Sequence, residues 1–592
     1  MKYLWCVIGC ICAFSAFAQQ QWTENDHDEH HLYQRMLVKS GGDSLIHPSI
    51  RPWLRRDVVK VALPYAIPGY HSSMDNELAQ SLLDANNEFI TSEYGALLSR
   101  YPNRYYVDST RTFYFPVSPV PSGWHPYRHS KYSLWNTFFT TPAHFYEIDV
   151  KDFYLRVNPL IHVGVGQESV ESAAIFINQR GISLRGGIGK GLYFQTSLFD
   201  SQARFPNYVN DFTAVHGVVP GVAFYKNYSS ALFDFTNGRD YLLAYAYVGF
   251  NAGKYVGIQL GHTQNFIGDG IRSLLLSDFA TPYFALRINT RIWKLHYQNI
   301  FAELAADNFQ SVSGRDEVIP KKYMSAHYLS FKPNKSVSVG LFEAVIYDQH
   351  NRGFELQYLN PVILYRSIEG NIGSPDNVLL GVNARVDVRK TMSIYGQFVL
   401  DDLHVRNILN GHLDWWGNKY GHQLGMKYFD MFGIPFLDGT LEWNRVRPFT
   451  YTHYDKAESY THYKQPLAHP VGANFNEWIF SAQYRPTARW LLESSLCFIH
   501  TGEDADSVAY GGNINTPNNQ RPEDYGYFIG RGIETNIVYW TAGAHFYLTP
   551  GVVLDAKLLW RQKRSASAGR ELDTRMFQVG VRYNMVRREE MF

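Results

Sequence analysis

The chain has 592 residues, a formal net charge of +1 and only 18% charged residues, a balance that gives no support to nucleic-acid binding or to electrostatic attachment to a membrane surface. A mean hydropathy of −0.27 excludes a bundle of membrane helices, because each such helix needs about 20 consecutive apolar residues. Aromatic residues make up 16% of the chain, and this content with moderate hydropathy is typical of a membrane β-barrel, where apolar and polar residues alternate.

The first 18 residues predict a secretory signal peptide. Lys2 supplies the positive charge, residues 4–14 are apolar, and the segment ends in the small-residue cleavage motif Ala16-Phe17-Ala18. An alternative lipoprotein signal would use Cys10, but this cysteine precedes the end of the apolar stretch. Cleavage leaves Cys497 as the one cysteine, so we expect neither a disulfide framework nor a cysteine metal site.

Residues 19–145 do not alternate cleanly and form a separate N-terminal region. We expect a solvated tail at "ENDHDEHH" (24–31), a helical segment over 76–98 and an irregular stretch rich in Pro, Trp and Tyr over 101–145. The region is predicted to plug the barrel or to lie beneath it in the periplasm.

The C-terminal residues show the period of two that a strand between lipid and water requires. Apolar residues at odd positions alternate with polar or small ones at even positions: Phe577, Val579, Val581, Tyr583 and Met585 against Gln578, Gly580, Arg582 and Asn584. Residues 552–561 and 538–548 repeat this alternation. We predict an all-β fold, an antiparallel outer-membrane barrel of about eighteen strands within residues 146–592.

The connectors between the predicted strands alternate in length. Short turns such as 485–489, 387–391, 332–336 and 251–255 are separated by long connectors such as 268–282, 348–376 and 502–535. Outer-membrane barrels have this arrangement, with short turns in the periplasm and long loops outside the cell.

The stretch "NFIGDGIRSLLLSD" (265–278) falls in one of the long connectors. Gly268 and Gly270 would permit positive φ where the chain folds over. The three leucines need a buried surface, so we expect the loop to fold inward or against a neighbouring loop. A phosphate-binding loop is excluded, because the stretch neither matches G-x-x-x-x-G-K-[ST] nor begins a helix in a βαβ unit.

This stretch resembles a segment of the RemB-type gliding-motility proteins, which are similar to the Wzi-type capsule-assembly outer-membrane proteins. The segments 180–206, 358–381 and 394–403 carry the same resemblance, which extends from about residue 145 to the C-terminus. The Wzi group implies an eighteen-stranded barrel closed from below by helices that holds surface polysaccharide. The RemB group implies a cell-surface protein that contributes to gliding and adhesion, and neither group implies catalysis.

Aromatic residues in the outer loops are the candidate glycan contacts. Trp415 and Trp416 lie beside Asp414 in "NGHLDWWGNKY", and their rings could stack on sugar faces while the carboxylate accepts hydrogen bonds from hydroxyls. The alternative is that both rings belong to the aromatic girdle found at the membrane interface of such barrels.

Six polar residues in two long loops are candidates for ordering those loops by charge pairing. Arg366 could bind a carboxylate in a fork, which would fix a loop that is otherwise mobile. The set comprises Asp269, Arg272, Asn360, Arg366, Glu369 and Asp376.

Catalytic, metal and cofactor sites are not expected. No G-x-S-x-G motif occurs. The histidines His27, His30, His31, His453 and His462 lie in segments predicted to be loose, which rarely give a metal ligand the support it needs.

We therefore expect a non-enzymatic outer-membrane protein whose loops act in polysaccharide association, adhesion or gliding motility. Its expected partners are outer-membrane lipid or lipopolysaccharide, surface polysaccharide and other outer-membrane or motility proteins, with no nucleic acid. A solute channel and a subunit of a larger assembly are the alternatives. Interior residues such as Gln578, Arg582, Asp555 and Lys557 suit the loop-presenting protein and the channel equally.

Overall fold

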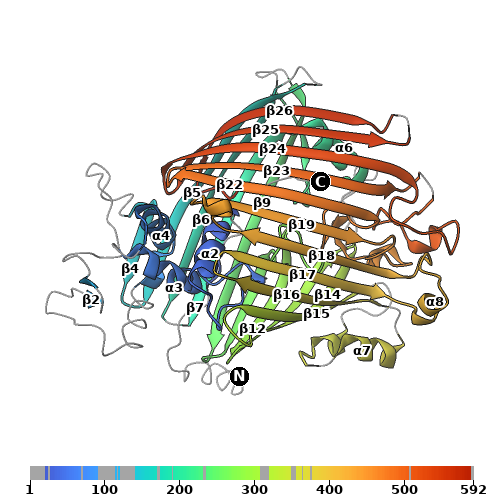
Figure 1. Ribbon diagram of the computed structural model, residues 1–592, viewed down its shortest axis with the longest axis horizontal. Coiled ribbons are helices and arrows are strands. Elements are labelled where there is room, and N and C mark those ends of the chain that lie inside the picture. Colours follow the sequence, from blue (N-terminus) through green and yellow to red (C-terminus); the bar gives the residue numbers. More distant parts are fainter. Residues whose placement is uncertain are drawn as a thin grey trace, which may run out of the picture.

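The computed structural model describes residues 21–23, 27–67, 71–90, 114–115, 118–119, 141–169, 174–189, 191–230, 235–306, 319–348, 355–362, 364–373, 376–505, 508–567 and 569–587. Most of these residues belong to one closed antiparallel barrel (Figure 1). No helix among them is long and apolar enough to cross a membrane.

Eighteen strands of the described chain form the barrel wall, as the sequence predicted. The wall closes where the last strand pairs with the first, with Phe577 opposite Gln167 and Tyr583 opposite Ile161. Two short strands, β4 (Tyr146–Val150) and β8 (Lys226–Ser230), add to its rims. The wall strands are β5 (Phe153–Glu168), β6 (Ile175–Ile188), β7 (Leu192–Arg204), β9 (Phe235–Ala252), β10 (Val256–Thr263), β12 (Tyr283–Ile292), β13 (Leu295–Ala305), β14 (Lys321–Phe331), β15 (Val337–Asp348), β16 (Asn377–Val388), β17 (Met392–Asp402), β18 (Lys419–Tyr428), β19 (Leu437–Val446), β22 (Phe475–Thr487), β23 (Trp490–Glu503), β24 (Ile533–Thr549), β25 (Val552–Ser565) and β26 (Leu572–Tyr583).

The period of two places apolar side chains on the outer face and polar ones in the lumen. In β26, Phe577, Val579 and Val581 are exposed on the lipid side, whereas Arg582 is buried in the lumen. Met585 departs from the predicted alternation, because β26 ends at Tyr583 and Met585 lies beyond it in the hydrophobic core.

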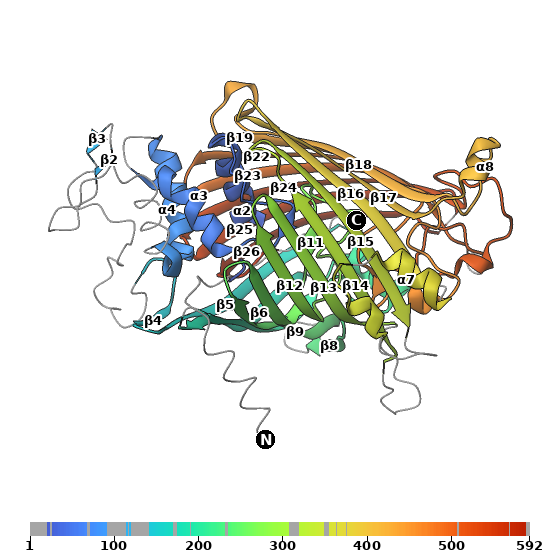
Figure 2. The same cartoon turned by 90° about the horizontal axis from the view of Figure 1, so that it is seen from below.

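Short turns gather at one end of the barrel and long loops at the other. Two residues connect β24 to β25, whereas the β23–β24 connector spans 504–532. The long loops carry α6 (Asn207–His216), α7 (Tyr365–Ile372) and α8 (Val405–Leu409), and Figure 2 shows α7 and α8 together at this end. The predicted separation of connectors by length is confirmed.

Helices α2 (His27–Lys39), α3 (Arg55–Ala66) and α4 (Ser73–Ala85) lie at the short-turn end (Figures 1 and 2). They share a hydrophobic cluster that also includes Phe436, from the turn between β18 and β19. Charged contacts join this N-terminal region to the wall: Glu88 pairs with Arg185 at 3.0 Å, and Asp57 pairs with Arg291 at 3.0 Å.

Two expectations about the N-terminal region need correction. From His27 onward the predicted tail is instead the start of α2, in which Asp28 and His30 are buried. Leu32, Tyr33, Met36 and Leu37 give this helix an apolar face, and Tyr547 donates a hydrogen bond of 2.7 Å to Asp28. The helix expected over 76–98 begins earlier, where Ser72 caps α4 by accepting from the Asp75 amide, and α4 ends at Ala85. Residues 91–98 and most of 101–140 lie outside the described residues.

Candidate functional site

The loop 265–278 folds into the lumen, as its leucines predicted. Leu274, Leu275 and Leu276 are 0% exposed and belong to the main hydrophobic core. Two residues of the loop between β19 and β22 cover them from the long-loop end, because Tyr451 donates to the Leu274 carbonyl at 2.7 Å and Tyr460 donates to the Leu275 carbonyl at 2.9 Å.

Its two glycines serve different purposes. Gly268 has φ +154°, whereas Gly270 does not have a positive φ, contrary to expectation. A Cβ at Gly270 would lie 2.4 Å from Glu442 Oε2, so close approach to that carboxylate is what requires a glycine there. Glu442 accepts hydrogen bonds from the amides of Ile271 (2.7 Å) and Arg272 (3.0 Å).

Inside the barrel this loop meets the N-terminal region. Strand β1 (Ile50–Arg51) pairs antiparallel with β11 (Phe266–Ile267). The Gly268 amide donates to the Ser49 carbonyl at 2.8 Å, and the Arg51 side chain donates to the Gly270 carbonyl at 2.6 Å. A segment from the short-turn end and a loop from the opposite end thus share a small sheet at the centre of the lumen.

Asp269 lies at this junction and is almost completely buried. Its carboxylate accepts hydrogen bonds from Arg385 at 3.0 Å, Asn383 at 3.0 Å and Ser49 at 2.7 Å. Burial alone would raise the pKa of Asp269, but the Arg385 guanidinium and these hydrogen bonds outweigh burial and hold the pKa below its ordinary value. The carboxylate therefore stays ionised in the lumen.

Arg272, three residues later, joins a second buried pair. Its guanidinium donates to Glu477 at 3.3 Å, and Glu477 is also 2.7 Å from His469 Nε2. Asp269 and Arg272 thus bind the inward loop to wall strands on the same side of the barrel, β16 and β22.

The other four loop-ordering candidates do not converge. Arg366 pairs with Glu369 at 2.7 Å within α7, but Arg366 is 65% exposed and only one of its nitrogens makes the contact, so it forms no fork. Asp376 instead accepts a hydrogen bond from Tyr358 at 2.5 Å. Asn360 is exposed, and its side chain accepts from the Val362 amide at 3.2 Å.

Trp415, Trp416 and Asp414 lie where three long loops meet, a surface we call the outer loop cluster (residues 403–418, 447–474 and 508–532). Asp414 accepts hydrogen bonds from the amides of Gly526 and Tyr527, both at 2.9 Å, through its side chain and its carbonyl respectively. The Arg521 guanidinium lies 3.9 Å from the ring centroid of Trp416, and the Trp415 and Trp416 rings are 5.6 Å apart. These residues hold the cluster together, and the cluster also carries exposed large side chains: Leu409, Leu413, Tyr454, Tyr525 and Phe528.

Three of the histidines considered as metal ligands have other partners in the structure. His31 contacts Asp438 at 2.8 Å, His453 pairs with Glu458 at 2.7 Å, and His462 Nδ1 accepts from the Ala305 amide at 2.9 Å. Among the described residues, no group of three or more His, Cys, Asp or Glu side chains could hold a metal ion.

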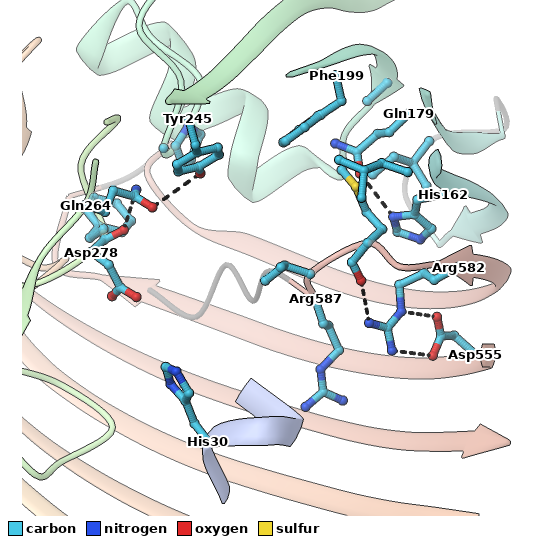
Figure 3. A pocket seen from close by; sticks show the side chains of 18 of the residues that line it. His30, His162, Gln179, Phe199, Tyr245, Gln264, Asp278, Asp555, Arg582 and Arg587 are labelled. Carbon is cyan, nitrogen blue, oxygen red and sulfur yellow. Dashed lines mark hydrogen bonds and ion pairs between the residues drawn. The ribbon is translucent and has the colours of Figure 1, made fainter. Parts of the chain in front are cut away.

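A cavity of about 430 Å³ remains between this packed material and the wall formed by β5–β10 and β23–β26 (Figure 3). The predicted interior residues Asp555, Lys557, Gln578 and Arg582 all line it. Arg582 binds the Asp555 carboxylate through two nitrogens, at 2.5 and 3.1 Å. On another part of the lining, Gln264 accepts from Tyr245 at 3.3 Å and donates to the Asp278 carbonyl at 2.8 Å.

Sequence reasoning missed the partners that complete these sites. Ser49 and Arg385 are separated in sequence from Asp269 by more than a hundred residues, and no local motif marks them. Tyr451 and Tyr460 lie in a loop in which only the histidines suggested a function. The local signal for these tyrosines was indirect: three consecutive leucines at 274–276 require other residues to cover them.

Comparisons with known proteins show which family and which solved structures this barrel is similar to. The family model "Capsule assembly protein Wzi" matches residues 164–540. Among solved structures, Wzi of Escherichia coli, described as a carbohydrate-binding β-barrel involved in group 1 capsule assembly, matches with a TM-score of 0.54 at 14% identity, over 95% of this chain and 99% of that chain. No curated protein matches the sequence significantly.

Two further solved structures match less well. OprD of Pseudomonas aeruginosa has a TM-score of 0.40 at 11% identity and covers 72% of this chain and 94% of its own. OccAB2 of Acinetobacter baumannii has a TM-score of 0.40 at 8% identity and covers 72% and 97%.

Proposed function

Because the chain belongs to the Wzi family of capsule assembly proteins, we propose that it is a non-enzymatic outer-membrane barrel that binds surface polysaccharide through its outer loop cluster. The polysaccharide would be held at the cell surface while the barrel anchors it in the membrane.

The observation that carries this proposal is the fixed outer surface built by Asp414 and Trp416. Hydrogen bonds between loops position the chain around Tyr525 and Phe528, whose side chains are exposed. Rigid aromatic side chains beside hydrogen-bonding groups are suited to sugar rings, since the apolar face of a ring can stack while its hydroxyls are bonded.

The packed lumen supports binding over transport. The inward loop, the β1–β11 sheet and the helices at the short-turn end occupy the space that a channel would need. We therefore retain the solute channel only as the alternative that a conductance measurement tests.

The binding experiment uses the purified full-length protein in detergent and capsular polysaccharide from the bacterium that produces it. We expect Trp415→Ala and the double variant Tyr525→Ala/Phe528→Ala to weaken binding at least tenfold. Trp293→Ala is the matched control, because Trp293 is 67% exposed in the short turn between β12 and β13, at the other end of the barrel. Equal losses in all three variants, or no binding by the parent protein, would contradict the proposal.

We propose further that polysaccharide held in this way serves adhesion or gliding, on the strength of the RemB resemblance in 265–278 and 358–381. A deletion strain is expected to lose surface spreading or attachment and to regain it with the parent gene but not with the Tyr525→Ala/Phe528→Ala variant.

The N-terminal signal is also part of the proposal. Gln21 is fully buried in the lumen, where it accepts from Tyr154 at 2.9 Å, only three residues after the predicted cleavage site. N-terminal sequencing of the protein from outer membranes is expected to begin at Gln19.

A further inference from the structure

One guanidinium in the lumen has only neutral partners among the described residues. Arg287 on β12 is 2% exposed and lines the cavity. It donates to Asn265 Oδ1 at 3.1 Å and to Gln259 Oε1, and its Nε has no partner. A buried charge without a countercharge is costly, so natural proteins usually pair it.

Three other arginines of the same cavity follow that rule. Arg272, Arg582 and Arg587 contact the carboxylates of Glu477, Asp555 and Glu493 respectively. Arg51 also lines the cavity, but its guanidinium donates to the backbone carbonyls of Gly268 and Gly270, at 3.2 and 2.6 Å. Arg287 has neither a carboxylate nor a backbone carbonyl as a partner in the described part of the chain.

Two further buried donors lie beside Arg287. Its guanidinium is 4.0 Å from the ring centroid of Trp22, and the indole Nε1 of Trp22 has the Tyr193 hydroxyl as a neighbour but no well-aligned hydrogen bond among the described residues. The Nε2 of Gln259 is also without a partner. The Gln259 orientation is fixed, because its oxygen must face the arginine that donates to it. Among the described residues, the Arg287 charge therefore has no anion beside it, and the Nε of Arg287 and the Nε2 of Gln259 have no acceptor.

The rest of the cavity has the size and lining of a ligand site. Its volume of about 430 Å³ lies within the range of roughly 300–1,000 Å³ that is usual for small-molecule pockets. Aromatic pairs on β7 and β9 form one wall, with Phe199 stacked on Tyr245 at 6.3 Å. The lining includes Pro220, Phe279 and Pro470, which belong to connectors at the long-loop end.

We propose that this cavity binds a carboxylate-bearing sugar, a uronic acid residue of an acidic glycan, whose carboxylate is held by Arg287, Gln259 and Trp22. A carboxylate supplies the missing countercharge and two acceptor oxygens, while the aromatic wall packs against the sugar ring. The inference rests on the proposed function, since it assigns the bound polysaccharide to the acidic class.

The test titrates the full-length protein in detergent with a tetrasaccharide that contains glucuronic acid, and with the same tetrasaccharide after its carboxyl groups are reduced to alcohols. Tryptophan fluorescence and calorimetry report binding. We expect saturable binding of the acidic form, weakened at least tenfold by carboxyl reduction and at least tenfold by Arg287→Gln. Arg564→Gln, which changes an exposed arginine near the long-loop rim, is the matched control and should bind as the parent does.

Trp22→Phe keeps an aromatic ring beside the guanidinium and removes the five-membered ring with its Nε1 donor, so it tests the site even if Arg287→Gln does not fold. We expect it to weaken binding about threefold. Equal affinity for the acidic and reduced forms, or unchanged affinity in both variants, would overturn the inference. Equal competition by acetate or phosphate would also overturn it, because the site would then recognise a simple anion.

The outcome for the proposed function is separate. If capsular polysaccharide binds and depends on Tyr525 and Phe528 while the acidic tetrasaccharide does not bind, only the cavity inference fails. If neither ligand binds, the proposed function fails as well.

Discussion

The two sides of the lumen differ in how their polar groups are satisfied. Along β16–β22, buried charges meet partners across the lumen, as Asp269 does with Arg385 and Arg272 does with Glu477. Along β5–β12 and β23–β26, the cavity separates the wall from the packed interior. Arg582 binds Asp555 on this side, but Arg287 has no carboxylate partner among the described residues. The side at β16–β22 therefore fixes the inward loop 265–278, whereas the side at β5–β12 and β23–β26 leaves room for a ligand.

The largest expected effect comes from removing what fills the first side. Replacing residues 268–278 with a short Gly-Ser turn deletes Asp269, Arg272 and the three buried leucines, so water and ions gain a path. We expect the parent protein to be nearly silent in planar bilayers and the variant to conduct at least tenfold more. A steady nanosiemens-scale pore in the parent would instead favour the solute channel. The same replacement in 403–413 is the control.

A single substitution tests the charge pairing of the first side. Asp269→Ala removes the acceptor of Arg385 Nη1 and Asn383, while Asp387 still accepts from Arg385 Nε at 2.9 Å. Because the guanidinium keeps one carboxylate, we expect the lost hydrogen bonds to cost about 1–3 kcal/mol of unfolding free energy. Urea unfolding in lipid vesicles, followed by tryptophan fluorescence, measures the loss. Asp573→Ala, which breaks an exposed pair with Arg564, should give no measurable change. Similar unfolding free energies for Asp269→Ala and Asp573→Ala would contradict a larger contribution of the buried Asp269 contacts than of the exposed Asp573 pair.

Lowering the pH tests the same packing through its buried histidines. Burial, with the nearby Lys322, lowers the pKa of His462 to about 3, against about 6.5 in an unfolded chain. The folded state therefore keeps this imidazole neutral while the unfolded chain takes up a proton, so stability is constant above about pH 6.5 and falls as the pH drops towards 3.

At pH 5 this single histidine should cost on the order of 1–2 kcal/mol relative to pH 7.5. Thermal unfolding monitored by circular dichroism at both pH values measures the difference. His462→Asn keeps an acceptor for the Ala305 amide but cannot be protonated, so its pH dependence should be smaller. Identical pH profiles for parent and variant would show that His462 does not contribute.

The smallest effect is expected outside the lumen, at α7. Arg366→Ala removes an exposed pair with Glu369, worth about 0.5 kcal/mol or less at three-residue helical spacing. We expect proteinase K to cut segment 355–373 up to twofold faster, with no change in barrel unfolding. Arg406→Ala on α8 serves for comparison, and an unchanged rate at Arg366→Ala would remove it from the loop-ordering residues.

The wall was predictable from sequence because lipid and lumen impose opposite demands on successive residues. Phe577, Val579 and Val581 face lipid and alternate with lumen-facing residues, as predicted. The leucines at 274–276 were predicted to be buried, and they are. Helix α2 was missed because its acidic, histidine-rich start resembles a tail, although Leu32, Tyr33, Met36 and Leu37 mark its buried face. The partners of Asp269 were not predictable, since barrel closure and two converging segments bring them together.

The two-stranded ladder of β1 and β11 has a mechanical consequence. A pull on the N-terminal region from the periplasm would load Ile50 and Arg51 in shear against Ile267 and Phe266, and the load would pass to the leucines beneath Tyr451 and Tyr460. Tension applied on the periplasmic side of the outer membrane would thus reach the long loops on the outer side through the lumen, without deforming the wall.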